Sequence, residues 1–216
     1  MKPSIALTFD DGPNGVATRS IVDILKSKNV PAAFFCIGSR IEKDPKTVRY
    51  VNDHGFSVAN HSWRHSFYLP VQSLSAMRDE LHRTSELLQT ITGRPPSLFR
   101  PPHGFCTPRL VSAAQQERLE IIGWSVDPQD YYTDNAQLIV ERIVKQAHDG
   151  GIILLHDGLH DGFRAKQLAD RKGTIEALPL VIDALREKGY DFVVLDQLPR
   201  MSHWTSHLFP TEPKTK

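Results

Sequence analysis

Seven short apolar runs, rich in Ile, Val and Phe, alternate with longer stretches of helical periodicity along the chain. The runs lie near residues 4–9, 32–37, 56–59, 97–100, 119–126, 151–156 and 190–195. Strands that alternate with helices form parallel sheets, because each helix carries the chain back to the start of the next strand. The pattern predicts an α/β fold, a closed or nearly closed β/α barrel, with an open doubly wound sheet as the alternative.

The domain organisation predicted from the sequence is simple. A chain of 216 residues can bury one sizeable core, and no repeat or second compositional region divides it. We expect one domain over residues 1–198 and an irregular C-terminal tail over 199–216. Residues 157–173 are predicted to form a polar loop with Arg164, Lys166 and Arg171. These side chains are expected to be solvated, and contact with substrate is the alternative.

Charge and hydropathy exclude several classes of partner. Lys and Arg total 26 and Asp and Glu total 25, so no sustained basic field is present to bind nucleic acid or an anionic membrane. No apolar run approaches the roughly 20 residues of a membrane-spanning helix. The N-terminus has no signal-peptide pattern, so the chain as written is expected to be a cytoplasmic monomer, or secreted or periplasmic if a leader has been removed. Cys36 and Cys106 lack CxxC spacing and are predicted to be buried as small hydrophobes.

Polar residues of catalytic type follow five of the predicted strands. They are Asp10 and Asp11, His61 and His65, the segment Arg100 to Gly104, Asp127 and Asp130, and His156 with Asp157. Each cluster alone could be a turn, a pair of surface histidines or a rigid proline loop. In a β/α barrel, however, the carboxyl ends of the strands converge on one face. Their recurrence at five strand ends therefore favours one shared site.

The residue types suit metal chemistry. The segment HSWRH places two imidazoles at i and i+4, on one face of a short helix if Asn60 caps it. A catalytic zinc-type site uses three N or O ligands from the protein, which two histidines and one aspartate provide. Neighbouring strand residues point in different directions, so one acid of the Asp10-Asp11 pair could bind metal while the other acts as general base.

Five motifs together resemble one known family. TFDDGP, HSWRH, RPPHG, DPQDYY and LLHDG are similar, in order and spacing, to the motifs of the NodB-type polysaccharide deacetylases, carbohydrate esterase family 4. The resemblance covers roughly residues 5–197 and is nearest to short chitooligosaccharide and peptidoglycan deacetylases. It implies a distorted (β/α)7 barrel and metal-dependent hydrolysis of an acetyl group on a glycan.

The resemblance also implies a role for each matched residue. The ligands of one divalent ion would be Asp11, His61 and His65. The catalytic residues would be Asp10 as base, His156 as general acid, Arg100 as the partner that keeps Asp10 ionised, and Asp127 as the carboxylate that adjusts His156. The substrate-binding residues would be Pro102, His103 with its backbone N–H at the oxyanion, Gly104, Tyr131, and Leu154 beside the acetyl methyl group.

The expected reaction is attack of a metal-activated water on the acetyl carbonyl of a chitooligosaccharide or other N-acetylglucosamine glycan. Zinc is the expected ion, and cobalt, manganese or nickel would suit the same ligands. Alternatives on the same barrel are an esterase for O-acetylated xylan or another glycan, and a non-catalytic glycan-binding protein. A phosphotransferase of the haloacid-dehalogenase or receiver type is disfavoured because the acids are adjacent and the expected lysine is absent. Two features depart from the commonest family pattern: His103, where an aromatic such as Tyr is expected, and Tyr131-Tyr132, where Trp is frequent.

Overall fold

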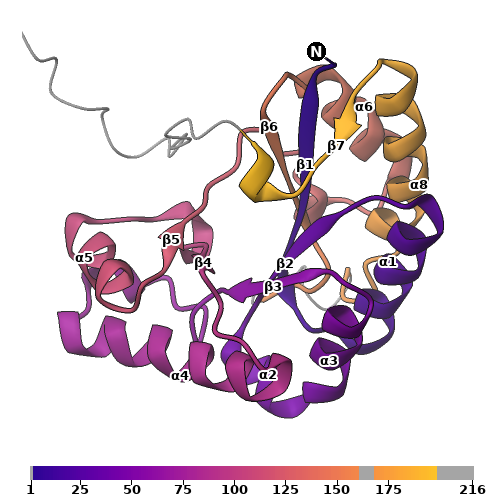
Figure 1. Cartoon of the computed structure of the whole chain (residues 1–216). Coiled ribbons are helices and arrows are strands. Elements are labelled where there is room, and N and C mark those ends of the chain that lie inside the picture. Colours follow the sequence, from indigo (N-terminus) through magenta and orange to yellow (C-terminus); the bar gives the residue numbers. More distant parts are fainter. Residues whose placement is uncertain (1, 161–167, 199–216) are drawn as a thin grey trace, which may run out of the picture.

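The computed structural model describes residues 2–160 and 168–198, which contain a seven-stranded parallel sheet. The strand order is β5-β4-β3-β2-β1-β6, and β7 pairs with the start of β1. The strands are β1 (Ser4–Gly12), β2 (Ala32–Cys36), β3 (Ser57–Asn60), β4 (Leu98–Phe99), β5 (Glu120–Ile121), β6 (Gly151–His156) and β7 (Asp191–Phe192). The sheet curls, and its helices lie around the outside (Figure 1). The prediction of a distorted (β/α)7 barrel in a single domain is confirmed.

Helices connect successive strands, and four of those in the described residues begin with a side-chain cap. They are α1 (Gly15–Lys28), α2 (Gly38–Lys43), α3 (Pro45–Asp53), α4 (Leu74–Thr92), α5 (Pro108–Gln116), α6 (Ala136–Gln146) and α8 (Lys172–Glu187). Single 3₁₀ turns are η1 (Leu69–Val71), η2 (Pro102–Gly104), η3 (Asp130–Tyr132) and η4 (Leu195–Gln197). The side chains of Asp44, Ser73, Thr107 and Asn135 each accept a hydrogen bond from an N–H of the first turn. These caps satisfy donors that a helix start leaves unpaired.

Alternation along β1 divides the core into two layers. Ile5, Leu7 and Phe9 face outward and pack in the large cluster under α1, α3, α6 and α8. Phe9 stacks on Phe34 with ring centroids 5.1 Å apart. Ala6 belongs to the smaller inner cluster, and successive residues of a strand face opposite sides. The inner face of β1 therefore delivers Asp10 to the barrel interior.

The barrel closes irregularly between β5 and β6. A strand was predicted over 119–126, but β5 pairs only through Glu120 and Ile121, and the chain rejoins β6 at one isolated bridge, Val126 to Ile153. Between these points the carbonyls of Ile122 and Gly123 accept hydrogen bonds from the Arg100 guanidinium. A side chain thus takes the place of a strand neighbour. The predicted strands 97–100 and 190–195 are likewise shorter than expected, as β4 and β7.

Other expectations have mixed outcomes. Cys36 and Cys106 are buried free thiols, as predicted. In the described ranges no helix is long and apolar enough to cross a membrane. Arg171 is 2% exposed, so the prediction that it is solvated is wrong. Arg164, Lys166 and the tail 199–216 lie outside the described residues.

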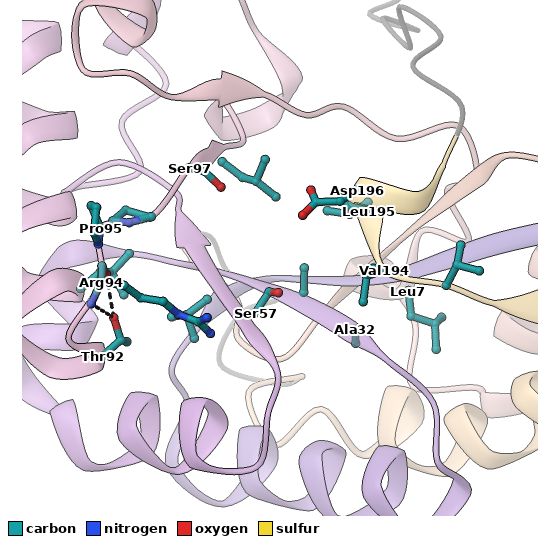
Figure 2. A pocket seen from close by; sticks show the side chains of 16 residues that line it. Leu7, Ala32, Ser57, Thr92, Arg94, Pro95, Ser97, Val194, Leu195 and Asp196 are labelled. Atoms are coloured by element: carbon teal, nitrogen blue, oxygen red, sulfur yellow. Dashed lines mark hydrogen bonds between the residues drawn. The ribbon is translucent and has the colours of Figure 1, made fainter.

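A hollow of about 200 Å³ lies at the amino-terminal ends of β2, β3 and β4 (Figure 2). Its walls include Ala32, Ser57 and Leu98 from the strand starts and Val194 and Leu195 from the segment after β7. It is therefore at the opposite end of the strands from the polar clusters predicted to form the site.

The outer core should carry much of the stability. Phe34 is fully buried between Phe9 and Phe56, with ring centroids 5.1 and 5.9 Å away. Phe34→Ala should lower the free energy of unfolding by about 3–5 kcal/mol, because it removes buried apolar surface and leaves a cavity. The control is Phe67→Ala at a ring that is 58% exposed, expected to change stability by no more than about 0.5 kcal/mol. Denaturant unfolding measures both, and equal losses would contradict this account of the core.

Candidate active site

Two adjacent carboxylates enter the barrel interior at the end of β1. The register of β1 with β2 shifts between Asp10 and Gly12, and Asp11 has a φ of 71°. This bend lets both side chains approach one imidazole. Asp10 Oδ2 lies 3.7 Å and Asp11 Oδ1 3.4 Å from Nε2 of His61. Both acids are almost completely buried.

The segment 61–65 forms an irregular loop, and the short helix predicted for it is wrong. A buried carboxylate holds the loop instead. Oε2 of Glu80, on α4, accepts hydrogen bonds from the backbone N–H groups of Trp63 and Arg64 at 3.0 and 2.8 Å. Asn60 does not cap a helix but accepts from the N–H two residues later. The i, i+4 spacing thus brings the two histidines together through a fixed loop.

Asp11, His61 and His65 form the one cluster in the described residues whose side chains could together hold a metal ion. Their ligand atoms lie within 4.8 Å of one another. Nδ1 of His61 is 2.7 Å from the carbonyl of Arg100, so it must carry the proton, and Nε2 presents a lone pair. That lone pair faces Asp11 Oδ1, a buried acceptor with no hydrogen-bond donor among the described residues. Two acceptors this close repel each other unless a proton or a metal ion lies between them, and the donor set fits a divalent metal.

The protonation states also suit metal binding. Burial lowers the pKa of His65 to about 2, against the opposing field of Asp11. The ring is therefore neutral and can act as a ligand. Backbone N–H of His160 donates to Asp11 Oδ2 at 2.9 Å, which leaves Oδ1 directed toward the histidines.

Arg100 is fully buried and pairs with Asp10. Its Nη1 lies 2.7 Å from Asp10 Oδ1 and 2.8 Å from the hydroxyl of Thr8. The guanidinium also packs over the ring of Phe35 at 4.2 Å. An arginine so placed favours the ionised carboxylate. The structure thus brings Arg100 and Asp10 together as predicted, with Oδ2 of Asp10 turned toward the candidate metal centre.

The structure corrects one predicted pairing, because the carboxylate that contacts His156 is Asp130 and not Asp127. Asp130 Oδ1 lies 2.7 Å from Nδ1 of His156, and Oδ2 accepts the backbone N–H of the same residue at 2.9 Å. Burial alone would lower the pKa of His156, but Asp130 outweighs it and raises that pKa to about 9. The carboxylate of Asp127 instead accepts from Gln129 N–H and the Tyr131 hydroxyl.

A buried arginine that sequence reasoning missed supports this pair. Arg171 is in the left-handed conformation immediately before α8, and its Nη2 lies 2.7 Å from Asp130 Oδ2. Its Nε donates to the carbonyl of His156 at 3.1 Å, and Thr174 adds a hydroxyl to Asp130 Oδ2 at 2.8 Å. Asp130 is thereby held ionised, with its pKa lowered to about 2 against the effect of burial, chiefly by His156 and Arg171.

The predicted substrate-binding residues surround this constellation. Leu154 is on the same face of β6 as His156 and is buried. Tyr131 packs edge-on against His156, with centroids 5.2 Å apart. Pro102 is buried, whereas His103 is exposed with a φ of 58° and its ring contacts His65. Gly104 has no room for a Cβ against Trp124, which fixes the course of this loop.

The chain matches the model of a known protein family. The family model for polysaccharide deacetylase matches residues 1–122, more than half of the chain. The chain belongs to the polysaccharide deacetylase family. The match includes the Asp11, His61 and His65 cluster and the Asp10–Arg100 pair.

Relatives of this chain are named as peptidoglycan or chitooligosaccharide deacetylases. The chain is 35% identical over 194 residues to the peptidoglycan-N-acetylmuramic acid deacetylase PdaC of Bacillus subtilis, spanning 90% of this chain and 38% of that protein. The structure of PdaC superposes with a TM-score of 0.77, covering 91% of this chain and 90% of the solved one. A peptidoglycan-N-acetylglucosamine deacetylase of Bacillus cereus is 32% identical, over 92% of this chain and 89% of that protein. A chitooligosaccharide deacetylase of Bradyrhizobium is 32% identical, over 90% of each.

The identity of the carboxylate beside His156 can be tested directly. Asp130→Asn removes the negative charge that opposes burial, so the pKa of His156 should fall from about 9 to below the ordinary value for histidine. The matched change Asp127→Asn should shift it far less. A nuclear magnetic resonance titration of the His156 imidazole measures both midpoints. A larger fall in the Asp127 variant would reverse the assignment.

Proposed function

We propose that this chain is a metal-dependent deacetylase that hydrolyses the N-acetyl group of N-acetylglucosamine-type sugars in peptidoglycan or chitooligosaccharides. One observation carries the proposal. Asp11, His61 and His65 form a buried donor set beside two separate proton-handling pairs, Asp10 with Arg100 and His156 with Asp130. Amide hydrolysis needs these three elements: electrophilic assistance, a base for water and an acid for the leaving amine.

Asp10 is the general base in this scheme. Arg100 holds Oδ1, so Oδ2 is the oxygen that accepts the proton from the attacking water. The arginine pairs with this carboxylate and fixes its orientation. Positioned bases of this kind contribute roughly 10²–10⁴-fold to a rate.

His156 is the general acid. Its Nδ1 is bound to Asp130, so Nε2 is the atom that donates a proton to the departing amine. An amine leaves poorly until it is protonated, and the raised pKa of His156 keeps the imidazolium available at neutral pH. Leu154, on the same strand face, is placed to contact the acetyl methyl group.

Asp11, His61 and His65 would hold the ion. A bound divalent cation would polarise the acetyl carbonyl and lower the pKa of water. Zinc suits two imidazoles and one carboxylate, and cobalt, manganese or nickel would bind the same ligands. The backbone N–H of His103 is proposed as a further donor to the oxyanion.

Two features favour a deacetylase of amides over the alternatives. An acid with a raised pKa is needed more by an amine than by an alcohol leaving group, which supports N-acetyl over O-acetyl substrates. The names of the relatives, which include peptidoglycan and chitooligosaccharide deacetylases, support the same class of sugar. A non-catalytic glycan-binding role has less support, because every candidate catalytic group is retained and paired.

The deciding experiment is acetate release from a panel of substrates. N-acetylated chitooligosaccharides and peptidoglycan fragments should be deacetylated, and acetylated xylan should react more slowly. Removing metal with a chelator should abolish release, and added zinc should restore it. Activity that survives complete metal removal would refute the proposed mechanism.

The base assignment predicts a specific loss. Asp10→Asn should lower kcat by about 10²–10⁴-fold, since the amide cannot accept the proton from water. The variant should still bind zinc, because Asp10 is not one of the proposed ligands. Unchanged kcat in a variant of confirmed zinc content would exclude Asp10 as the base.

The ligand assignment can be measured without turnover. His65→Gln should weaken zinc binding by at least tenfold, because one of three protein ligands is replaced by a poorer donor. The matched control is His82→Gln, at a histidine on α4 that is 55% exposed and pairs with Glu117. Isothermal titration with zinc compares the two. Equal affinity in both variants would remove His65 from the metal centre.

A further inference from the structure

A group of exposed aromatic side chains extends from the candidate metal centre across the loop after β3. We call His103, Phe67, Phe105 and Tyr68 the aromatic shelf. Phe67 is 58% and Tyr68 70% exposed, although both are large rings. They lie two and three residues after His65 in the sequence, yet neither belongs to a motif considered above.

The shelf is continuous with the site. The ring of His103 lies 4.5 Å from that of His65 and 5.5 Å from that of Phe67, measured between centroids. Phe67 in turn packs nearly perpendicular to Phe105, with centroids 4.9 Å and ring planes 85° apart. Tyr68 lies 5.9 Å beyond Phe67. The rings thus lead from a candidate metal ligand outward to the surface.

The rings support one another but do not enter a core cluster of the described residues. Contiguous exposed apolar surface is uncommon on soluble proteins and marks binding sites when it adjoins a functional centre. The edge-to-face contact with Phe105 fixes the orientation of Phe67 while more than half of its surface remains open. A rigid, flat and solvated ring suits a ligand with a flat apolar face.

A pyranose ring has such a face, formed by its axial C–H groups, with hydroxyl groups at the edge that remain in water. A glycan chain places further pyranose rings on either side of the residue that reacts. On the other side of the constellation, Tyr131 contacts His156 and packs on Tyr132, which is 56% exposed. Aromatic surface therefore adjoins both the metal-binding and the proton-donating sides.

We propose that the aromatic shelf, with Phe67 at its centre, binds a sugar residue that neighbours the one to be deacetylated. This inference rests on the proposed function for the identity of the reacting sugar. The shelf favours oligosaccharides over single sugars, because only an oligosaccharide supplies a second pyranose ring to stack on Phe67. Phe67 is a specificity-determining residue and takes no part in proton transfer.

The test compares three substitutions on the same loop. Phe67→Ala removes the ring, Phe67→Leu keeps apolar bulk without a flat face, and Val71→Ala truncates a neighbouring exposed apolar residue that is 69% exposed. Each is placed in zinc-loaded protein with and without Asp10→Asn, which prevents turnover during binding measurements. Denaturant unfolding confirms that the folds are intact.

Calorimetry with N-acetylated chitopentaose gives the first readout. Both Phe67 variants should bind it about tenfold more weakly, which is about 1.4 kcal/mol, while Val71→Ala binds like the parent. Binding of N-acetylglucosamine should be unchanged in all three. Undiminished pentasaccharide affinity in Phe67→Ala, or full affinity in Phe67→Leu, would overturn the shelf as a stacking surface.

Hydrolysis separates this inference from the proposed function. With Asp10 intact, Phe67→Ala should raise the KM for chitopentaose and leave kcat nearly unchanged. It should hydrolyse a small acetate ester without sugar at the parental rate. If no protein releases acetate yet pentasaccharide affinity depends on Phe67, the proposed function fails and the shelf stands. If acetate release is normal and the affinity for chitopentaose does not depend on Phe67, the shelf proposal is wrong and the proposed function stands.

Discussion

The buried ion pair between Arg100 and Asp10 is the interaction on which the rest of the site depends. A charged group inside a barrel is very unfavourable unless it is paired and fully hydrogen-bonded. The guanidinium of Arg100 meets this condition by contacting Asp10, Thr8 and the carbonyls of Ile122 and Gly123. It therefore joins β1 to the segment after β5 across the barrel interior. The irregular closure of the sheet is the structural consequence, because those carbonyls are turned toward a side chain.

A second buried pair, His156 with Asp130, stabilises a positive charge at the site. Arg100 pairs with the carboxylate of Asp10, the proposed base, whereas Asp130 favours the charged form of His156, the proposed acid. Arg171 completes the second arrangement by neutralising Asp130 from behind without contacting the imidazole nitrogen that faces the site. One base and one acid can thus coexist in the same interior. A different buried partner fixes each of the two groups.

Much of the fold could be predicted from the sequence, and the failures have physical causes. The long strands β1, β2 and β6 have continuous apolar runs because both faces are buried, and they form as predicted. The strands β4, β5 and β7 are shorter than the apolar runs predict, and β5 and β7 each pair with only one neighbouring strand in the described residues. Local composition does not distinguish these two situations.

The sequence predicts the site residues that directly follow a strand. It misses the site residues that an irregular segment positions. Asp127 comes first in DPQDYY and was assigned to His156, but Gln129 has a φ of 56°, so the chain turns and presents Asp130 instead. Arg171 is 41 residues from Asp130, and only tertiary folding brings them together. For both Asp130 and Arg171 the sequence contains a feature that could have indicated the residue. Asp130 was a second acid at the same strand end, and Arg171 was a basic residue just before a helix.

Backbone strain shows how the centre is kept rigid. Asp11, Ser62, His65 and His103 all have positive φ, which costs about 1–3 kcal/mol for each residue other than glycine. Such conformations persist only where surrounding contacts enforce them. Glu80 does so for the histidine loop through two backbone hydrogen bonds, and Arg40 does so for Asp11 by donating to its carbonyl at 2.8 Å. Glu80 and Arg40 are therefore as much a part of the site as the proposed metal ligands, because without them the backbone would relax and the candidate donor atoms would separate.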